Sequence, residues 1–162
     1  MWTIEPADVS SPDALKLLRE YFVDVADRYY LVHLGRRGTT DEIETGLAGA
    51  PSDDLAPPTG VFLLGTYDGK AAGCAGLRIK DAETVELGRV FVRPAFRGTA
   101  GGPALLAAVD DVARALGAKL IILDTRLDLT EARALYTKNG YEEVSPYKQD
   151  KYAEIFYAKQ LT

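Results

Sequence analysis

A basic, glycine-rich turn lies in the middle of this sequence, between a β-branched strand and an apolar helix. The turn runs from Arg97 to Pro103 and contains Gly98, Gly101 and Gly102. Because glycine has no Cβ, the backbone N–H groups of such a turn approach a ligand closely, and the dipole of the next helix adds positive potential. The turn therefore predicts a pyrophosphate site, with a flexible strand-to-helix connection as the alternative.

Two well-known phosphate motifs do not fit this turn. No GlyLysSer or GlyLysThr follows the glycines, which excludes a P-loop, and the glycines lack the GxGxxG spacing. Binding of FAD or NAD by another kind of α/β protein stays open as an alternative.

The elements that would position the turn predict an α/β fold. Apolar runs separated by turn residues indicate strands over 2–4, 61–67, 70–79, 84–92, 119–124, around 141–144 and over 153–159. Helical spacing of apolar residues indicates helices over 12–28, 40–47, 103–116 and 129–138. The expected order is β, α, α, β, β, β, α, β, α, β, β.

Capping residues mark two of the expected helix starts. Ser11 is an expected N-cap with Pro12 in the first turn, and Asp128 is an expected N-cap with Glu131 as its capping-box partner. The segment 49–60 contains three prolines and is expected to be a loop.

Composition limits the class of protein. The 162 residues predict a single domain over 1–162. A net charge of −5 argues against nucleic acid or an anionic membrane as a partner, since those need a basic face. Cys74 is the only cysteine, which excludes an internal disulfide and a cysteine-based zinc site, and is expected in the core. No leader or membrane span is evident, so we expect a cytoplasmic protein.

Two motifs give the sequence a resemblance to the GCN5-related N-acetyltransferase (GNAT) family. Residues 97–102 resemble the family's acetyl-CoA signature, R/Q-x-x-G-x-G/A. A second signature, A-x-x-L-Y-x-K-x-G-[FY], is matched by Ala132, Leu135, Tyr136, Lys138, Gly140 and Tyr141. The expected order of elements also resembles that family, with a mixed, twisted sheet flanked by helices.

The resemblance implies an enzyme that transfers an acetyl group from acetyl-CoA to a primary amine by direct attack in a ternary complex, without a metal. The pantetheine arm would bind along the strand before the turn, as an added strand would. The implied cofactor residues are Val90, Phe91, Val92, Arg97, Gly98, Thr99, Ala100, Gly101, Gly102 and Lys138.

The resemblance also implies two catalytic residues. Glu86 is the expected base, because the amine is mostly protonated at neutral pH and must lose a proton. Strand alternation places Glu86 on one face with Val90 and Val92, unless a bulge intervenes. A solvated charge, or a partner for Arg89, is the alternative. Tyr136 is the expected acid for the leaving thiolate, with an aromatic packing role as the alternative.

The acceptor is expected to be a small amine or amino acid. Tyr29, Tyr30 and Tyr147 are the candidate substrate residues, although helical spacing on its own places the aromatic residues near 21–30 in the core. His33 is expected to be a surface or packing residue. A non-catalytic acyl-CoA sensor and an enzyme acting on a protein amino group stay open, and a homodimer is among the oligomeric states.

Three residues depart from the family's usual pattern. Ala100 stands where glycine is usual, so a positive φ there would bring strain of order 1 kcal/mol unless Gly101 takes over that conformation. Pro103, expected at the first helical position, brings no N–H group. Leu129 stands where many members have asparagine, so a side-chain contact to the cofactor is lost.

Overall fold

The computed structural model describes residues 1–162 and contains one mixed sheet of seven strands. In sheet order, the strands are β1 (Trp2–Ala7), β2 (Gly60–Tyr67), β3 (Lys70–Ile79), β4 (Thr84–Val92), β5 (Leu120–Thr125), β7 (Ile155–Gln160) and β6 (Glu142–Val144). The helices are α1 (Pro12–Leu34), α2 (Thr40–Ala48), α3 (Gly101–Ala115) and α4 (Thr130–Lys138), with a 3₁₀ turn over Pro94–Phe96. The predicted order of elements is confirmed.

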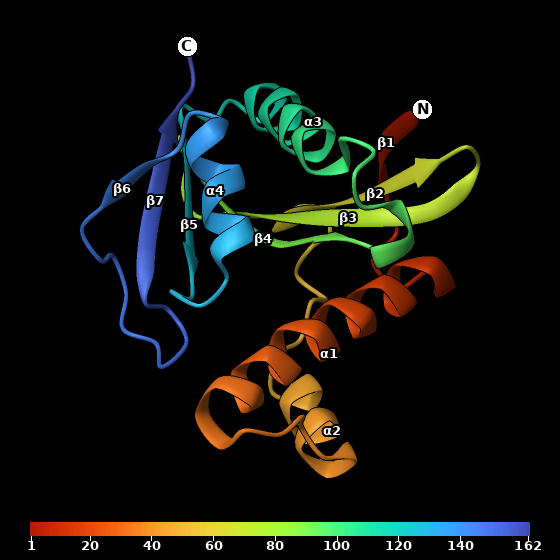
Figure 1. Ribbon diagram of the computed structural model, residues 1–162. Coiled ribbons are helices and arrows are strands. Elements are labelled where there is room, and N and C mark those ends of the chain that lie inside the picture. Colours follow the sequence, from red (N-terminus) through yellow and green to blue (C-terminus); the bar gives the residue numbers. More distant parts are fainter.

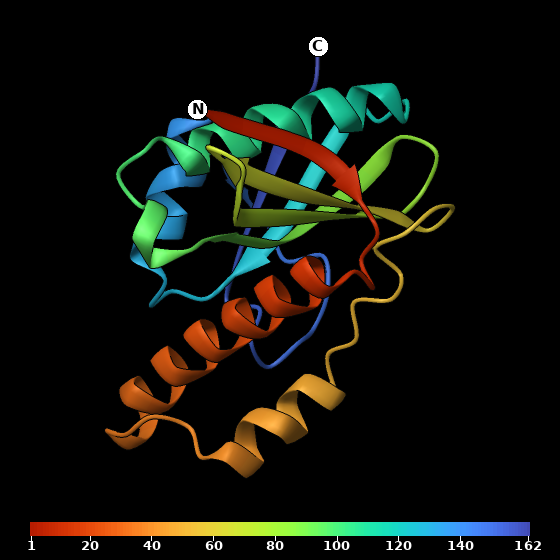
Figure 2. The same ribbon diagram turned by 90° about the vertical axis from the view of Figure 1, so that its right-hand side faces the viewer.

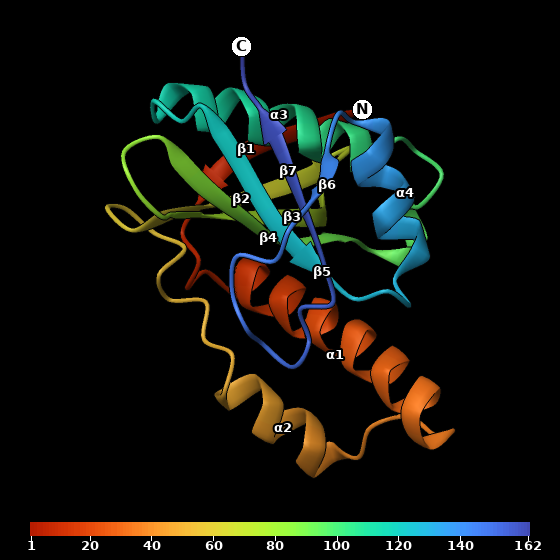
Figure 3. The ribbon, with the colours of Figure 1, turned by 90° about the vertical axis from the view of Figure 1, so that its left-hand side faces the viewer.

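The sheet separates two helical layers (Figures 1 and 2). Helices α3 and α4 cover one face, where the larger core includes Leu77, Leu105 and Ile121. Helix α1 covers the other face, where a smaller core includes Leu17 and Phe91, and α2 lies beyond α1 (Figure 3). Each face of the sheet is thus apolar and covered, as in other layered α/β folds.

The smaller core contains the single cysteine. Cys74 on β3 is fully buried, as predicted, beside Phe91 and Leu17. Burial raises the pKa of its thiol to about 12. Because the thiolate is the reactive form, this cysteine is a packing residue.

Helices α1 and α3 each differ from the sequence predictions at one end. Helix α1 has the predicted cap at Ser11 but continues past Arg28 to Leu34, where Gly35 ends it with φ 69°. Helix α3 begins at Gly101, so Pro103 is its third residue and not its first. In both cases, local spacing indicates the helix but not where packing lets it begin or end.

The fourth helix also starts differently. The predicted N-cap Asp128 does not cap α4; its carboxylate accepts both hydrogen bonds from the Arg126 guanidinium, at 2.9 and 3.0 Å. Glu131 is paired with Arg28 at 2.8 Å and does not complete a capping box. Charged partners from elsewhere in the fold thus take both side chains away from the local motif.

Strands β4 and β5 diverge halfway along their length. They pair in parallel from Thr84 opposite Leu120 to Glu86 opposite Ile122, and no further. Beyond that point β4 pairs only with β3, and β5 only with β7. The sheet therefore opens between β4 and β5 on the C-terminal side of Glu86, where backbone groups are free to meet a ligand.

A bulge in β4 lies at this opening. The segment from Gly88 to Phe91 on β4 has one residue more than the segment of β3 opposite it, Gly76 to Cys74. Arg89, within the extra stretch, has φ 57°, a left-handed conformation that is uncommon for a residue other than glycine. An extra residue on one strand reverses the alternation of side chains beyond it.

The bulge changes which residues share a face with Glu86. Leu87 packs in the core beneath α3, so Glu86 points to the face covered by α1. Beyond the bulge, Val90 and Val92 pack against the α3 core, whereas Phe91 belongs to the core beneath α1. The simple alternation, which placed Glu86 with Val90 and Val92, is therefore wrong for this strand.

Candidate active site

A narrow cavity of about 260 Å³ occupies the opening between β4 and β5. It lies between the middle of α1, the first residues of α3 and one side of α4. Its lining includes Gly88, Val90, Phe91, Val92, Arg97, Gly102, Leu129, Ala132, Leu135 and Tyr136. The cavity thus follows the outer half of β4 toward the glycine turn.

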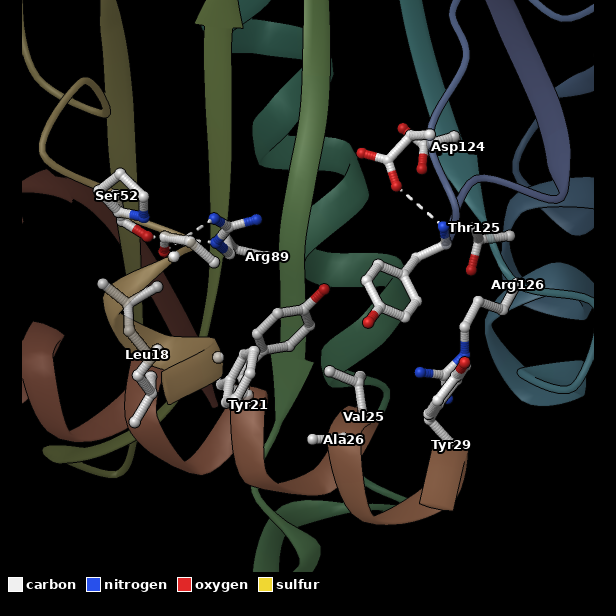
Figure 4. Close-up of a pocket in the computed structure, with 18 of the residues that line it drawn as sticks. Leu18, Tyr21, Val25, Ala26, Tyr29, Ser52, Arg89, Asp124, Thr125 and Arg126 are labelled. Atoms are coloured by element: carbon white, nitrogen blue, oxygen red, sulfur yellow. Dashed lines mark hydrogen bonds between the residues drawn. The ribbon is translucent and has the colours of Figure 1, made fainter. Parts of the chain in front are cut away.

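A second, wider cavity of about 1030 Å³ lies between α1, α2 and the C-terminal ends of the diverging strands. Figure 4 shows side chains of α1 that point toward Arg89 on one side and toward Asp124 and Arg126 on the other. Its lining includes Phe22, Tyr29 and Tyr30 from α1, residues 49–54, and Lys148, Asp150 and Tyr152 from the segment before β7. The volume suits a small organic molecule.

The two cavities meet at a common set of residues, here called the junction. Its members are Tyr21, Val25, Arg89, Asp124, Thr125 and Leu129, each of which lines both cavities. Two ligands, one in each cavity, could therefore touch at the junction.

The glycine turn closes the far end of the narrow cavity. Ala100 itself has φ 63° and ψ 29°, and Gly101 is helical, so the strained conformation is not passed to the glycine. The first intrahelical hydrogen bond runs from the N–H of Ala104 to the carbonyl of Ala100, at 3.2 Å. The N–H groups of Gly101 and Gly102 therefore have no helical partner and are available to an anion, while Pro103 has none to offer.

Trp2 fixes this turn against β1. Its indole N–H is directed at two oxygens of Thr99, the carbonyl at 3.1 Å and the hydroxyl at 3.0 Å. A Cβ on Gly101 would lie 2.3 Å from the indole ring, so only glycine fits at this point. Packing with the first strand thus explains Gly101 without any ligand. Gly102 instead lies against Leu135 on the wall of the narrow cavity, and the space beside Gly98 is open.

The basic residues predicted for the cofactor lie in different places. Arg97 lines the narrow cavity and donates from Nε to the carbonyl of Val92, at 3.2 Å. Lys138 is exposed in the last turn of α4, outside both cavities. The geometry therefore brings Arg97 to the pocket but not Lys138.

Tyr136 lines the narrow cavity from α4. The residue is 8% exposed, and burial raises the pKa of its phenol. A raised pKa keeps the hydroxyl protonated at neutral pH, so it can donate a hydrogen bond or a proton.

Glu86 lies behind the junction, in neither cavity. Its Oε2 accepts hydrogen bonds from the Tyr147 hydroxyl at 3.0 Å and from Lys148 Nζ at 3.3 Å. Burial, with the nearby negative charge of Glu86, raises the pKa of the Tyr147 phenol. Tyr147 therefore covers Glu86 and does not line the wide cavity, whereas Tyr152 from the same segment does.

Asp124 is the carboxylate at the junction, and sequence reasoning missed it. It lines both cavities and forms an ion pair with Lys148, at 2.7 Å. A signal existed, because Asp124 follows the apolar run of β5 and a polar residue that ends a central strand often belongs to a site. Glu86, the acidic candidate predicted from the sequence, lines neither cavity and is joined to Asp124 through Lys148.

The aromatic residues of α1 line the wide cavity. All four are partly buried and belong to its wall: Tyr21, Phe22, Tyr29 and Tyr30. Tyr21 also packs against the smaller core, as predicted, whereas the assignment of Phe22, Tyr29 and Tyr30 to the core is wrong. Tyr21 also packs edge-on against Phe91, with ring centroids 6.2 Å apart. Helical spacing correctly predicts that these side chains lie on one face of α1, but that face borders the wide cavity.

Comparison with known proteins identifies the fold and its chemistry. A profile described as the acetyltransferase (GNAT) family matches residues 15–141. The chain belongs to the GNAT acetyltransferase family. The resemblance on the two signatures is therefore confirmed, and the mixed sheet with its diverging β4 and β5 is the GNAT fold.

Individual GNAT relatives support the same assignment. An IAA acetyltransferase of Azospirillum brasilense is 34% identical over 94 residues, a match that covers 57% of this chain and 61% of that protein. An N-acetyltransferase of Schizosaccharomyces pombe is 28% identical over 80% of each chain. The crystal structure of PaiA N-acetyltransferase from Thermoplasma acidophilum in complex with coenzyme A superposes with a TM-score of 0.71, at 18% identity over 98% of this chain and 99% of that one.

None of the helices α1 to α4 has both the length and the apolarity that crossing a membrane requires.

His33, expected at the surface or in packing, is exposed near the end of α1 and lies against Tyr29, with ring centroids 4.3 Å apart.

Proposed function

We propose that this GNAT acetyltransferase transfers the acetyl group of acetyl-CoA to the primary amine of a small molecule, by direct attack in a ternary complex. The observation that carries the proposal is the meeting of a narrow and a wide cavity at the junction around Asp124. Two substrates that bind from opposite sides can react there without a covalent enzyme intermediate.

The narrow cavity is assigned to acetyl-CoA. Its walls offer a peptide-like arm the edge of β4 that faces β5, which has no strand partner beyond Glu86, and offer a pyrophosphate the free N–H groups of Gly101 and Gly102 with Arg97. The neighbour from Thermoplasma acidophilum holds coenzyme A, which supports this choice. Bound here, acetyl-CoA supplies an activated thioester, and backbone N–H groups near Phe91 and Val92 are candidates to stabilise developing negative charge on its oxygen.

Asp124 is assigned to the amine. It is the carboxylate exposed to both cavities, so it can hold an incoming ammonium group and accept its proton. Glu86 is proposed as a positioning residue, because it reaches Asp124 only through their shared partner Lys148. This arrangement gives Glu86 a part in the reaction without direct contact with the substrate.

Tyr136 is proposed as the proton donor to the leaving thiolate. It lines the narrow cavity, where the sulfur would lie, and its raised pKa keeps the proton on the phenol until the thiolate forms. Donation at that moment stabilises the departing group, whose charge is absent in the ground state.

The proposal is tested by incubating the protein with acetyl-CoA and a panel of primary amines, with mass spectrometry of the products and measurement of free thiol. Acetylated amine and free CoA in equal amounts are expected. Thermal shift with acetyl-CoA, FAD and NAD gives an independent readout, because a true ligand raises stability by about 2.7 kcal/mol at a hundredfold excess over its Kd. Binding of acetyl-CoA without any acetylated amine would favour a sensor instead.

A further inference from the structure

Arg89 is held in an unusual backbone conformation at the junction of the two cavities. Its φ of 57° lies in the bulge of β4, and its carbonyl oxygen accepts a hydrogen bond from the Cys74 thiol at 3.3 Å. Strained residues of this kind persist where the surrounding structure holds them, and they concentrate at functional sites. The bulge directs the Arg89 side chain into the wide cavity (Figure 4).

The guanidinium of Arg89 is positioned but not neutralised. Its Nε donates to the Ser52 hydroxyl at 3.2 Å, and one Nη donates to the carbonyl of Ala50 at 3.5 Å. Both partners are neutral, and the other Nη makes no hydrogen bond within the protein. A partly buried arginine with unused donors in a fixed fork geometry is a binding group for a carboxylate.

The other basic side chains on the wall of the wide cavity are already paired. Each has a carboxylate within 3 Å: Arg78 with Asp54 at 2.6 Å, Arg126 with Asp128 at 2.9 Å, and Lys148 with Asp124 at 2.7 Å. No carboxylate pairs with the Arg89 guanidinium within 4 Å, and Asp54, the acidic group whose charge acts on Arg89, is already paired with Arg78. A partly buried cation is costly without an anion, so the unpaired position points to an anion brought by the ligand.

The remaining wall of the cavity suits an apolar body. Phe22, Val25, Tyr29, Tyr30 and Tyr152 line it between the charged groups. Arg89 and Asp124, of opposite charge, both belong to the junction. A ligand with an amine and a carboxylate on one apolar or aromatic skeleton would give Arg89 an anion, present its amine to Asp124 and fill this wall.

We propose that the acceptor is an amine that also carries a carboxylate, an apolar or aromatic amino acid, whose carboxylate binds Arg89 while its amine faces Asp124. This inference rests on the proposed acetyl transfer and specifies its substrate class. In the reaction the amine nitrogen forms an amide bond with the acetyl carbon, the C–S bond breaks, and one proton passes to the enzyme or solvent while the thiolate gains one.

The test compares matched acceptors: aromatic and aliphatic L-amino acids, each with its primary amide and its decarboxylated amine. For the best acid, we expect kcat/KM at least about tenfold above that of its amide, since one charge-assisted hydrogen-bonded pair is removed. In Arg89→Asn, the kcat/KM values of the acid and its amide should become equal. Asparagine is chosen because it tolerates the positive φ of the bulge. Arg89→Lys should retain part of the ratio, because lysine keeps the charge but not the fork.

Arg37→Gln is the matched control, because Arg37 is an exposed arginine outside both cavities. In this variant, the ratio of kcat/KM for the acid to kcat/KM for its amide should equal that of the wild type. Thermal melting establishes that each variant is folded. An amide that reacts as well as its acid, or an acid preference that survives Arg89→Asn, would overturn this inference and leave acetyl transfer standing.

Calorimetric titration of each acid and each amide into the protein with bound CoA measures their affinities without turnover. Tighter binding of the acid, lost in Arg89→Asn, supports the inference even where no amine is acetylated. Equal binding of acid and amide overturns it. Absence of any acetylated product across the panel would instead contradict the proposed acetyl transfer.

Discussion

Lys148 places its ammonium nitrogen 2.7 Å from a carboxylate oxygen of Asp124, at the junction of the two cavities. The same nitrogen lies 3.3 Å from Glu86, so one cation bridges two carboxylates from the diverging strands. Burial favours the neutral amine, but hydrogen bonds and charge from Asp124 and Glu86 outweigh it and raise the pKa of Lys148. The lysine therefore stays charged and joins the two carboxylates through one ammonium group.

Replacement of Lys148 by methionine should lower kcat/KM by about tenfold or more. Without the bridging cation, Asp124 and Glu86 lose their shared partner and repel each other, so Asp124 is no longer held at the junction. Lys16→Met, at an exposed site on α1, is the control and should leave kcat/KM unchanged in the same steady-state assay. An unchanged kcat/KM in Lys148→Met would exclude this coupling.

Substitution of the two carboxylates should separate contact from positioning. Asp124→Asn should lower kcat by about a hundredfold or more, the usual effect of losing a general base. Glu86→Gln, which acts only through Lys148, should cost about tenfold, uniformly across pH. Steady-state kinetics at several pH values, with melting curves as a check of folding, make the comparison. A larger loss in Glu86→Gln than in Asp124→Asn would return the role of base to Glu86.

Tyr136→Phe should lower kcat by about tenfold or more while acetyl-CoA binding changes little, because the phenol acts only when the thiolate forms. Burial raises the pKa of this phenol, so its ionisation should not appear in the alkaline limb below about pH 10. Tyr141→Phe is the matched control, since its buried hydroxyl has no hydrogen-bond partner and packs beside Tyr136. Equal kcat values for the two variants would remove Tyr136 from the reaction.

Most of the helices and strands could be predicted because hydrophobic periodicity and turn residues are properties of short stretches of sequence. Thr84–Val92 was predicted to the residue, and the AspGly turn between β2 and β3 was found because Asp68 and Gly69 must both adopt positive φ. The bulge at Arg89 has no such signal, since nothing in the residue type demands a left-handed conformation there. Tertiary packing imposes it, and with it which later residues of β4 share a face with Glu86.

The site itself depends on distant segments that sequence spacing does not bring together. Asp124 and Lys148 meet because β5 and the segment before β7 are neighbours in the sheet, not in the chain. The tyrosines of α1 have the spacing of a buried stripe, and only the opening of β4 from β5 leaves a cavity opposite them. The glycine turn was found because its chemistry lies within one short stretch.

Ala100→Gly should stabilise the protein, because the turn requires φ 63° at this position. Relief of left-handed strain contributes about 1–2 kcal/mol, and the greater freedom of glycine in the unfolded chain offsets about 0.5–1 kcal/mol of it. The net gain of about 0.5–1 kcal/mol corresponds to a rise in Tm of about 1–4 °C, measured by calorimetry. Ala107→Gly, on the exposed side of α3, should instead cost about 1 kcal/mol. A lower Tm in Ala100→Gly would mean that Ala100 makes contacts in the turn that outweigh its strain.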